Sequence, residues 1–91
     1  MTTKTVWTAA VNNAIADDRK FAKAVLGALG RFARHDWGEL CEEDKKYNDM
    51  DLKNRDGHVV ARYKTNRDDI YIVRDFYPHY DVVTVLFCSE Y

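Results

Sequence analysis

The spacing of apolar residues changes from a helical period to a strand period near the middle of the chain. Over residues 5–16 apolar side chains recur every three or four positions, which predicts an amphipathic helix. Asp17 and Asp18 then favour the N-cap and first turn of a second helix. Its buried face is predicted to comprise Phe21, Val25, Leu26, Leu29 and Phe32. Gly27 and Gly30 disfavour helix, so they indicate either close approach of another element or a helix end near Gly30.

A polar segment with a sparse apolar stripe follows. Asp36 and Glu39 have the spacing of a capping box, in which the Asp side chain accepts from amides of the first helical turn. Residues 39–53 therefore predict one or two short helices that contact the domain through few apolar side chains. Trp37 is expected to be buried and to anchor this segment. Residues 54–57, Asn-Arg-Asp-Gly, predict a turn.

In the second half the period becomes two, which is typical of strands. Strands are predicted over residues 58–64, 70–74 and 81–88, with a hairpin connection at 66–69. Pro78 cannot donate to a strand ladder, so a loop is expected around it. The last strand is apolar on both sides and is expected to be central or covered by a helix.

These elements predict an α+β fold. Two or three N-terminal helices would pack on one face of a three-stranded antiparallel meander. Ninety-one residues, 46% of them hydrophobic, suffice for one ordered domain. We expect a single domain over residues 1–91, with a helical half at 5–53 and a sheet half at 58–88.

Charge is distributed unevenly, although the net charge is only −1. Residues 1–35 carry six basic and two acidic side chains, whereas residues 36–51 carry seven acidic and two basic ones. The small total argues against general affinity for nucleic acids. The acidic run favours a solvated face, an interaction surface, or a metal or acid–base site. Its members after Asp36 are Glu39, Glu42, Glu43, Asp44, Asp49 and Asp51.

No motif identifies a catalytic, metal or cofactor site. An EF-hand loop would need further ligands where Lys53 and Asn54 follow Asp51. The three histidines have no ligand spacing to one another or to a cysteine. One nucleophile and base pair, Cys88 with His79, stays as an alternative. We therefore predict no enzyme activity, no metal and no cofactor.

Cys41 and Cys88 are far apart in the sequence, and no apolar run approaches the length of a membrane span. This pattern predicts a cytoplasmic protein with two reduced, mostly buried thiols and no membrane contact. A single disulfide is the alternative if the protein is exported.

Aromatic residues concentrate around Pro78, where four rings fall within residues 76–80. Tyrosine is common at protein interfaces because it is large, rigid and amphipathic. Tyr77 and Tyr80 are therefore predicted either to cap the end of the sheet or to contact a partner.

From residue 32 onward the chain resembles a family of short, largely uncharacterised plasmid-related proteins that are carried by bacterial plasmids, integrative elements and phages. The matching residues are Asp36-Trp37-Gly38-Glu39-Leu40-Cys41-Glu42-Glu43-Asp44-Lys45, Asn48-Asp49, Leu52, Ala61-Arg62-Tyr63, Ile70-Tyr71-Ile72-Val73, Thr84-Val85-Leu86-Phe87 and Ser89-Glu90-Tyr91. Two departures stand out: residues 75–80 replace a shorter Asp-Arg-Ser, and Cys88 replaces a proline. The resemblance implies a mobile-element setting and assigns no catalytic residue.

The leading hypothesis is a non-enzymatic protein-binding module, in concrete form an inhibitor of a host defence nuclease such as a CRISPR nuclease. An acidic surface of this kind can occupy a basic nucleic-acid channel. We expect Glu39, Glu42, Glu43, Asp44, Asp49 and Asp51 to contact the partner, together with Tyr77 and Tyr80. The alternatives are a nucleic-acid-binding accessory protein that uses the basic first 35 residues and, third, a small enzyme. The oligomeric state stays open.

Overall fold

The structure is a computed structural model and describes residues 2–91. In chain order its elements are β1 (Thr2–Trp7), α1 (Ala9–Asp17), α2 (Arg19–Ala33), α3 (Glu42–Asn54), β2 (His58–Tyr63), β3 (Ile70–Phe76), β4 (Tyr80–Phe87) and a short 3-10 helix, η1 (Cys88–Glu90). The α+β class is thus confirmed. A strand, however, precedes the predicted helical half.

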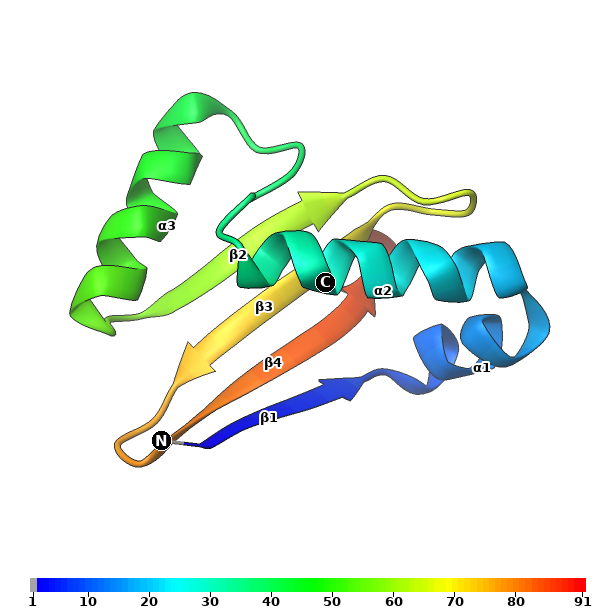
Figure 1. Cartoon of the computed structure of the whole chain (residues 1–91), viewed down its shortest axis with the longest axis horizontal. Helices are drawn as coiled ribbons and strands as arrows, with labels where there is room; N and C mark the ends of the chain where they lie inside the picture. The colour runs from blue at the N-terminus through cyan, green and yellow to red at the C-terminus, as the bar shows by residue number, and fades with distance from the viewer. Residues whose placement is uncertain (1) are drawn as a thin grey trace.

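The four strands form one mixed sheet in the order β1-β4-β3-β2 (Figure 1). β2, β3 and β4 make the predicted antiparallel meander, while β1 pairs in parallel with β4. The predicted three-stranded sheet is therefore wrong by one strand. β4 lies between β1 and β3, which confirms its predicted central position.

The strand that the sequence analysis missed, β1, overlaps the start of the helix predicted over residues 5–16. The chain is extended through Trp7, and helix α1 begins only at Ala9. Thr8 is the N-cap, and its Oγ1 accepts from the Val11 amide at 3.3 Å. Three threonines in β1 favour extended backbone because their β-branched side chains are restricted in a helix.

Helix α2 begins as predicted and ends later than predicted. Asp18 is its N-cap, with Oδ1 accepting from the Phe21 amide at 3.1 Å. The helix continues through Gly30 to Ala33. A Cβ at Gly27 would meet no atom within 4 Å, so the predicted close approach is wrong. Leu26 is also exposed, against the prediction.

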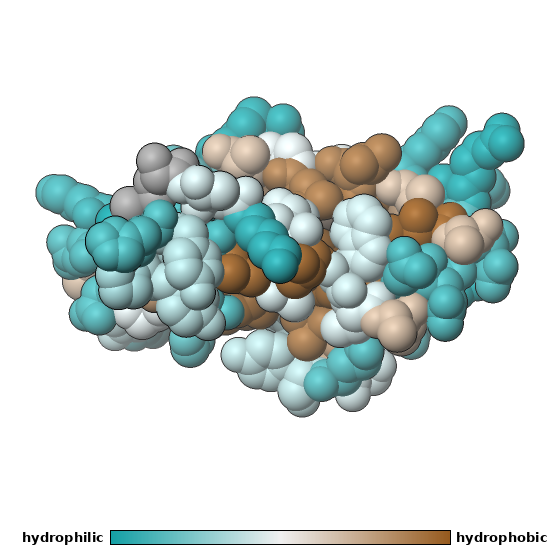
Figure 2. All heavy atoms as spheres, turned by 90° about the horizontal axis from the view of Figure 1, so that it is seen from below, coloured by the Kyte–Doolittle hydropathy of each residue, from teal (hydrophilic) through white to brown (hydrophobic). Residues whose placement is uncertain are grey.

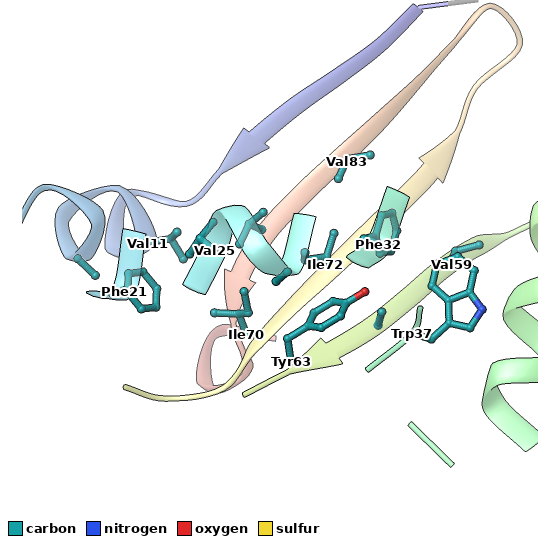
Figure 3. Close-up of a cluster of buried hydrophobic side chains, with 14 residues drawn as sticks. Val11, Phe21, Val25, Phe32, Trp37, Val59, Tyr63, Ile70, Ile72 and Val83 are labelled. Atoms are coloured by element: carbon teal, nitrogen blue, oxygen red, sulfur yellow. The ribbon is translucent and has the colours of Figure 1, made fainter. Parts of the chain in front are cut away.

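The core lies between the helices α1 and α2 and one face of the sheet, as Figure 3 shows. Helical residues Phe21, Val25 and Phe32 pack over strand residues such as Ile70 and Ile72. Strand residues next to these in sequence point to the opposite face. In register across that face lie Val60, Val73 and Thr84 on the three antiparallel strands, and Tyr71 next to Leu86.

The segment after β4 lies against that opposite face. The ring of Tyr91 is 5.1 Å from the ring of Tyr71, centroid to centroid. Figure 1 shows α2 in front of the sheet and α3 beside β2. Most of the opposite face is thereby left without a helical cover among residues 2–91.

Candidate interaction surface

Helix α3 and the loop before it are attached to the outer edge of β2. Gly38 forms a parallel bridge with Arg62, and the Glu39 amide donates to the Arg62 carbonyl oxygen at 2.8 Å. Further along, the Asn48 side chain donates to the Val60 carbonyl oxygen at 2.8 Å and accepts from the Val60 amide at 3.4 Å. An open strand edge invites pairing with another chain. These contacts engage the backbone of Val60 and Arg62 along that edge instead.

Trp37 is buried, as predicted, with 3% of its surface exposed. Its ring packs edge-on against Phe32 and stacks on His35, and Figure 3 shows it at the end of the core nearest α3. The indole Nε1–H donates to Asp49 Oδ1 at 2.8 Å. Trp37 therefore anchors α3, and one oxygen of Asp49 is engaged within the fold.

The predicted capping box at Asp36 is wrong. Helix α3 begins at Glu42, with Cys41 as an N-cap that makes no side-chain cap bond. The Asp36 carboxylate instead accepts two hydrogen bonds from Arg31, at 2.8 and 3.1 Å, and one from the Gly38 amide at 3.2 Å. The hydrogen bonds from Arg31 hold the pKa of Asp36 below its ordinary value. Asp36 thus fixes the turn that leads to β2.

The acidic side chains of α3 fall into three groups. Glu42, Glu43 and Asp44 occupy the first turn and are exposed, where the helix dipole favours negative charge. Glu39 is exposed just before the helix. Asp49 faces Trp37, and Asp51 is half-buried one turn before the helix ends. The predicted acidic surface is real, but its members do not share one environment.

A groove lies between α3 and the uncovered face of the sheet, and its volume is about 330 Å³. From α3 it receives Asp44, Tyr47, Asn48 and Asp51, which follow the i, i+3, i+4, i+7 spacing of one helix stripe. The remaining lining comes from Leu40, His58, Val60, Tyr71 and Tyr91. Sequence reasoning missed the groove, although this polar stripe with a tyrosine in it was a signal.

Tyr77 and Tyr80 are at the tip of the β3–β4 hairpin. Their exposed rings stack with centroids 4.9 Å apart, and the Tyr77 amide donates to the Tyr80 carbonyl oxygen at 3.0 Å. Arg55, just after α3, donates to the Tyr77 carbonyl oxygen at 3.1 Å. The hairpin thus lies at the C-terminal end of α3. The first-turn acids are about 18 Å away along the helix, so these acids and the two tyrosines do not form one contact region.

Asp81 is the most deeply buried charge, with 1% of its side chain exposed. It accepts from Arg55 at 2.7 Å and from Arg74 at 2.7 Å, and both guanidinium groups also lie over the Phe76 ring. The hydrogen bonds from Arg55 and Arg74 lower the pKa of Asp81 against the opposing effect of burial. This cluster joins the end of α3 to the hairpin.

The cysteines are less buried than predicted. Cys41 is exposed and Cys88 is half-buried, and both thiols are free. Cys88 is in η1 at the far end of β4 from His79, a distance of roughly 26 Å along eight strand residues, so the two do not form a nucleophile and base pair. Burial raises the pKa of the Cys88 thiol, which disfavours the reactive thiolate.

A second, smaller groove of about 230 Å³ runs between β1 and α2, lined by residues that include Thr3, Leu29 and Val83. Figure 2 views the molecule from the β1 side and shows hydrophobic residues across the middle with hydrophilic ones toward both ends.

Within residues 2–91 no cluster of three or more His, Cys, Asp or Glu side chains is arranged to hold a metal. No helix in the described part of the chain could cross a bilayer.

Several of the residues on which the family resemblance depends make contacts that stabilise this fold. Trp37, Gly38, Asn48 and Asp49 together hold the loop and α3 against β2. Comparison of the chain with protein-family models, curated proteins and solved structures found no match. The function is therefore argued from the surface itself.

Proposed function

We propose that the chain is a non-enzymatic protein-binding module of a mobile genetic element that acts in the host cytoplasm. Its acidic surface, defined as Glu39, Glu42, Glu43 and Asp44, would contact a basic surface of the partner. The most concrete partner is a host defence nuclease, whose nucleic-acid channel must be basic. Inhibition would then follow from occupation of that channel.

The observation that carries this proposal is the concentration of exposed acids at one end of a firmly held helix. Three carboxylates crowd the first turn of α3, and within residues 2–91 the one ion pair that they form joins Glu42 to Lys45 at 3.5 Å on the same helix. Because Trp37 and Asn48 fix α3 to the sheet, the charges are held in place before a partner arrives. Preorganisation of this kind reduces the entropic cost of binding.

Tyr77 and Tyr80 supply a separate contact in this proposal. Their stacked rings are exposed at the hairpin tip, and the Arg55 contacts hold the hairpin in position. Large rigid rings of this type often contribute most of the affinity at an interface. A partner that covers both regions would have to extend along the length of α3.

The test uses the kinetics of binding to candidate defence nucleases purified as intact complexes. Glu42→Lys with Glu43→Lys reverses two exposed charges, so we expect association about tenfold slower, with a weaker dependence on salt. The matched control, Arg19→Glu with Lys20→Glu, reverses two exposed charges on α2 and should leave association nearly unchanged. Equal effects of the two variants, or no binding to any basic-channel complex, would reject the proposal.

The alternative of a nucleic-acid-binding accessory protein has one observation in its favour. The exposed residues of α2 include Arg19, Lys20 and Lys23, and Arg34 follows at its end. These cations lie on a different helix from the acids, so the molecule offers a basic face as well. Direct measurement of DNA binding separates this alternative from the leading proposal.

A further inference from the structure

The groove between α3 and the sheet has an unusual combination of walls. Three tyrosine rings line it, from Tyr47 on the helix, Tyr71 on β3 and Tyr91 after η1. Two carboxylates, Asp44 and Asp51, lie on the same helical stripe, two turns or about 10 Å apart along the helix axis. Aromatic faces and carboxylates are the two kinds of group that attract an organic cation.

Neither carboxylate is neutralised by the chain. Within residues 2–91, Asp44 and Asp51 form no ion pair, and their side chains accept no hydrogen bond. By contrast, Asp49 accepts from Trp37, and Asp81 is clamped by two arginines. The groove therefore keeps two uncompensated negative charges, one of them on the half-buried Asp51.

The shape and the remaining lining favour one long side chain over a larger ligand. A volume of about 330 Å³ is at the small end of ligand pockets. Leu40 and Val60 add an apolar surface on which the methylene stem of Lys or Arg can lie while its head reaches one of the two carboxylates and is attracted by the other. An anion would be repelled, and an apolar group would leave the carboxylates without a partner.

The groove is open along its rim. Tyr47 and Tyr91 are 55% and 68% exposed, so a side chain that projects from another protein can enter without displacing an element of the fold. We propose that this groove is a recognition pocket for a single arginine or lysine side chain presented by a protein partner. The inference rests on the proposed function and narrows it, because it names which residue type of the basic partner is read and where.

The test is a titration of the whole isotope-labelled chain, followed by amide NMR. The probes are blocked Gly-Arg-Gly and Gly-Lys-Gly peptides, each matched with a neutral counterpart that carries citrulline or acetyl-lysine. We expect saturable shifts of amides around Tyr47, Asp51 and Tyr71 at peptide concentrations up to about 10 mM, and no such shifts with the neutral peptides. Shifts of equal size with the neutral peptides would overturn the proposal.

Variants then assign the effect to the groove. Asp44→Asn with Asp51→Asn removes both charges at nearly unchanged size and should weaken binding at least about tenfold. Tyr91→Ala should weaken it about threefold through loss of a cation–π wall. Glu39→Gln with Glu42→Gln is the matched control at the start of the same helix, on two exposed acids that contact no residue of the groove wall, and should change affinity less than about twofold. A control loss as large as that of the Asp44/Asp51 variant would show attraction by the general acidic surface and would overturn the pocket.

The two proposals fail in different ways. If reversal of Glu42 and Glu43 slows association with a nuclease but no peptide saturates the groove, the proposed function stands and the pocket is wrong. If the groove binds the cationic peptides but association is insensitive to Glu42 and Glu43, the pocket stands and the acidic-surface proposal is wrong. Thermal unfolding of each variant confirms that the fold is retained.

Discussion

At Gly38 the backbone has a left-handed conformation, with φ of 72°, and a Cβ would lie 2.0 Å from the Arg62 carbonyl oxygen. That oxygen is the acceptor for the Glu39 amide. Any side chain at this position would therefore push the loop away from β2. The requirement for glycine is set by one contact across the sheet edge.

Gly38→Ala is predicted to destabilise the fold by at least about 2 kcal/mol, since left-handed backbone alone costs ~1–2 kcal/mol for an L-residue. Urea unfolding should show a lower midpoint at an unchanged slope. The matched control is Gly27→Ala, in open space on α2, which should stabilise by roughly 1 kcal/mol because alanine favours helix. A Gly38 variant with the wild-type midpoint would mean that the loop does not pack this closely against the Arg62 carbonyl oxygen.

Among the elements, α3 is the one whose position its own sequence explains least. Its 13 residues are mostly polar, and Asn48 is its one buried residue. The two hydrogen bonds between the Asn48 side chain and Val60 of β2, together with the Trp37–Asp49 bond, attach α3 to the domain, as the apolar face does for α2. A polar helix held in this way keeps its acidic side chains at the surface.

At its C-terminal end α3 is held by charge. Arg55 reaches the buried Asp81 of β4, which Arg74 of β3 also contacts. Removing the charge of a buried, paired carboxylate leaves the partner cations uncompensated. The orientation of the hairpin tip, with Tyr77 and Tyr80, depends on this cluster.

Stability is predicted to fall in acid through Asp81. Folding holds the pKa of this carboxyl below its ordinary value of 3.8, so as pH falls the unfolded chain binds the proton first. The stabilising contribution is therefore complete well above pH 3.8 and is lost as pH falls through 3.8 toward the folded-state pKa. Asp81→Asn should lower the free energy of unfolding by about 2–4 kcal/mol at neutral pH. The difference from wild type should shrink progressively as pH falls below 3.8.

Urea unfolding over a pH series measures this difference. The matched control, Asp56→Asn, removes an exposed carboxylate beside α3 and should follow the wild-type curve within about 0.5 kcal/mol. If the free energies of unfolding of the Asp81 variant and wild type differ by the same amount at every pH, the variant loses packing and not a charge interaction.

For the molecule as a whole, the small net charge conceals two opposed surfaces. Exposed cations lie on α2 and exposed acids on α3, while the total is −1. Such a charge distribution orients an approaching partner more than it attracts one. It also bears directly on the choice between the protein-binding and nucleic-acid proposals.

We predict no measurable binding to random duplex DNA at about 150 mM salt, because affinity for the backbone requires many uncompensated cations. Fluorescence anisotropy of a labelled duplex measures this. As a positive comparison, Glu42→Lys with Glu43→Lys raises the net charge by four units and should bind more tightly at low salt. Micromolar binding by the wild type with a steep salt dependence would favour the accessory-protein alternative.

The sequence alone determined α2 with its Asp18 cap, the meander of β2, β3 and β4, and the burial of Trp37. Each of these follows from local information: a capping side chain, a repeat of 3.6 or 2 residues, or the apolar surface of one large ring. The tertiary structure decided the rest. Residues 2–7 became a strand because β4 offered a free edge, although apolar spacings from residue 5 onward also fit a helix. The groove forms only where α3, the sheet and the segment after β4 meet. The contact between Tyr71 and Tyr91 joins residues far apart in the sequence, so the local spacing of apolar residues could not predict it.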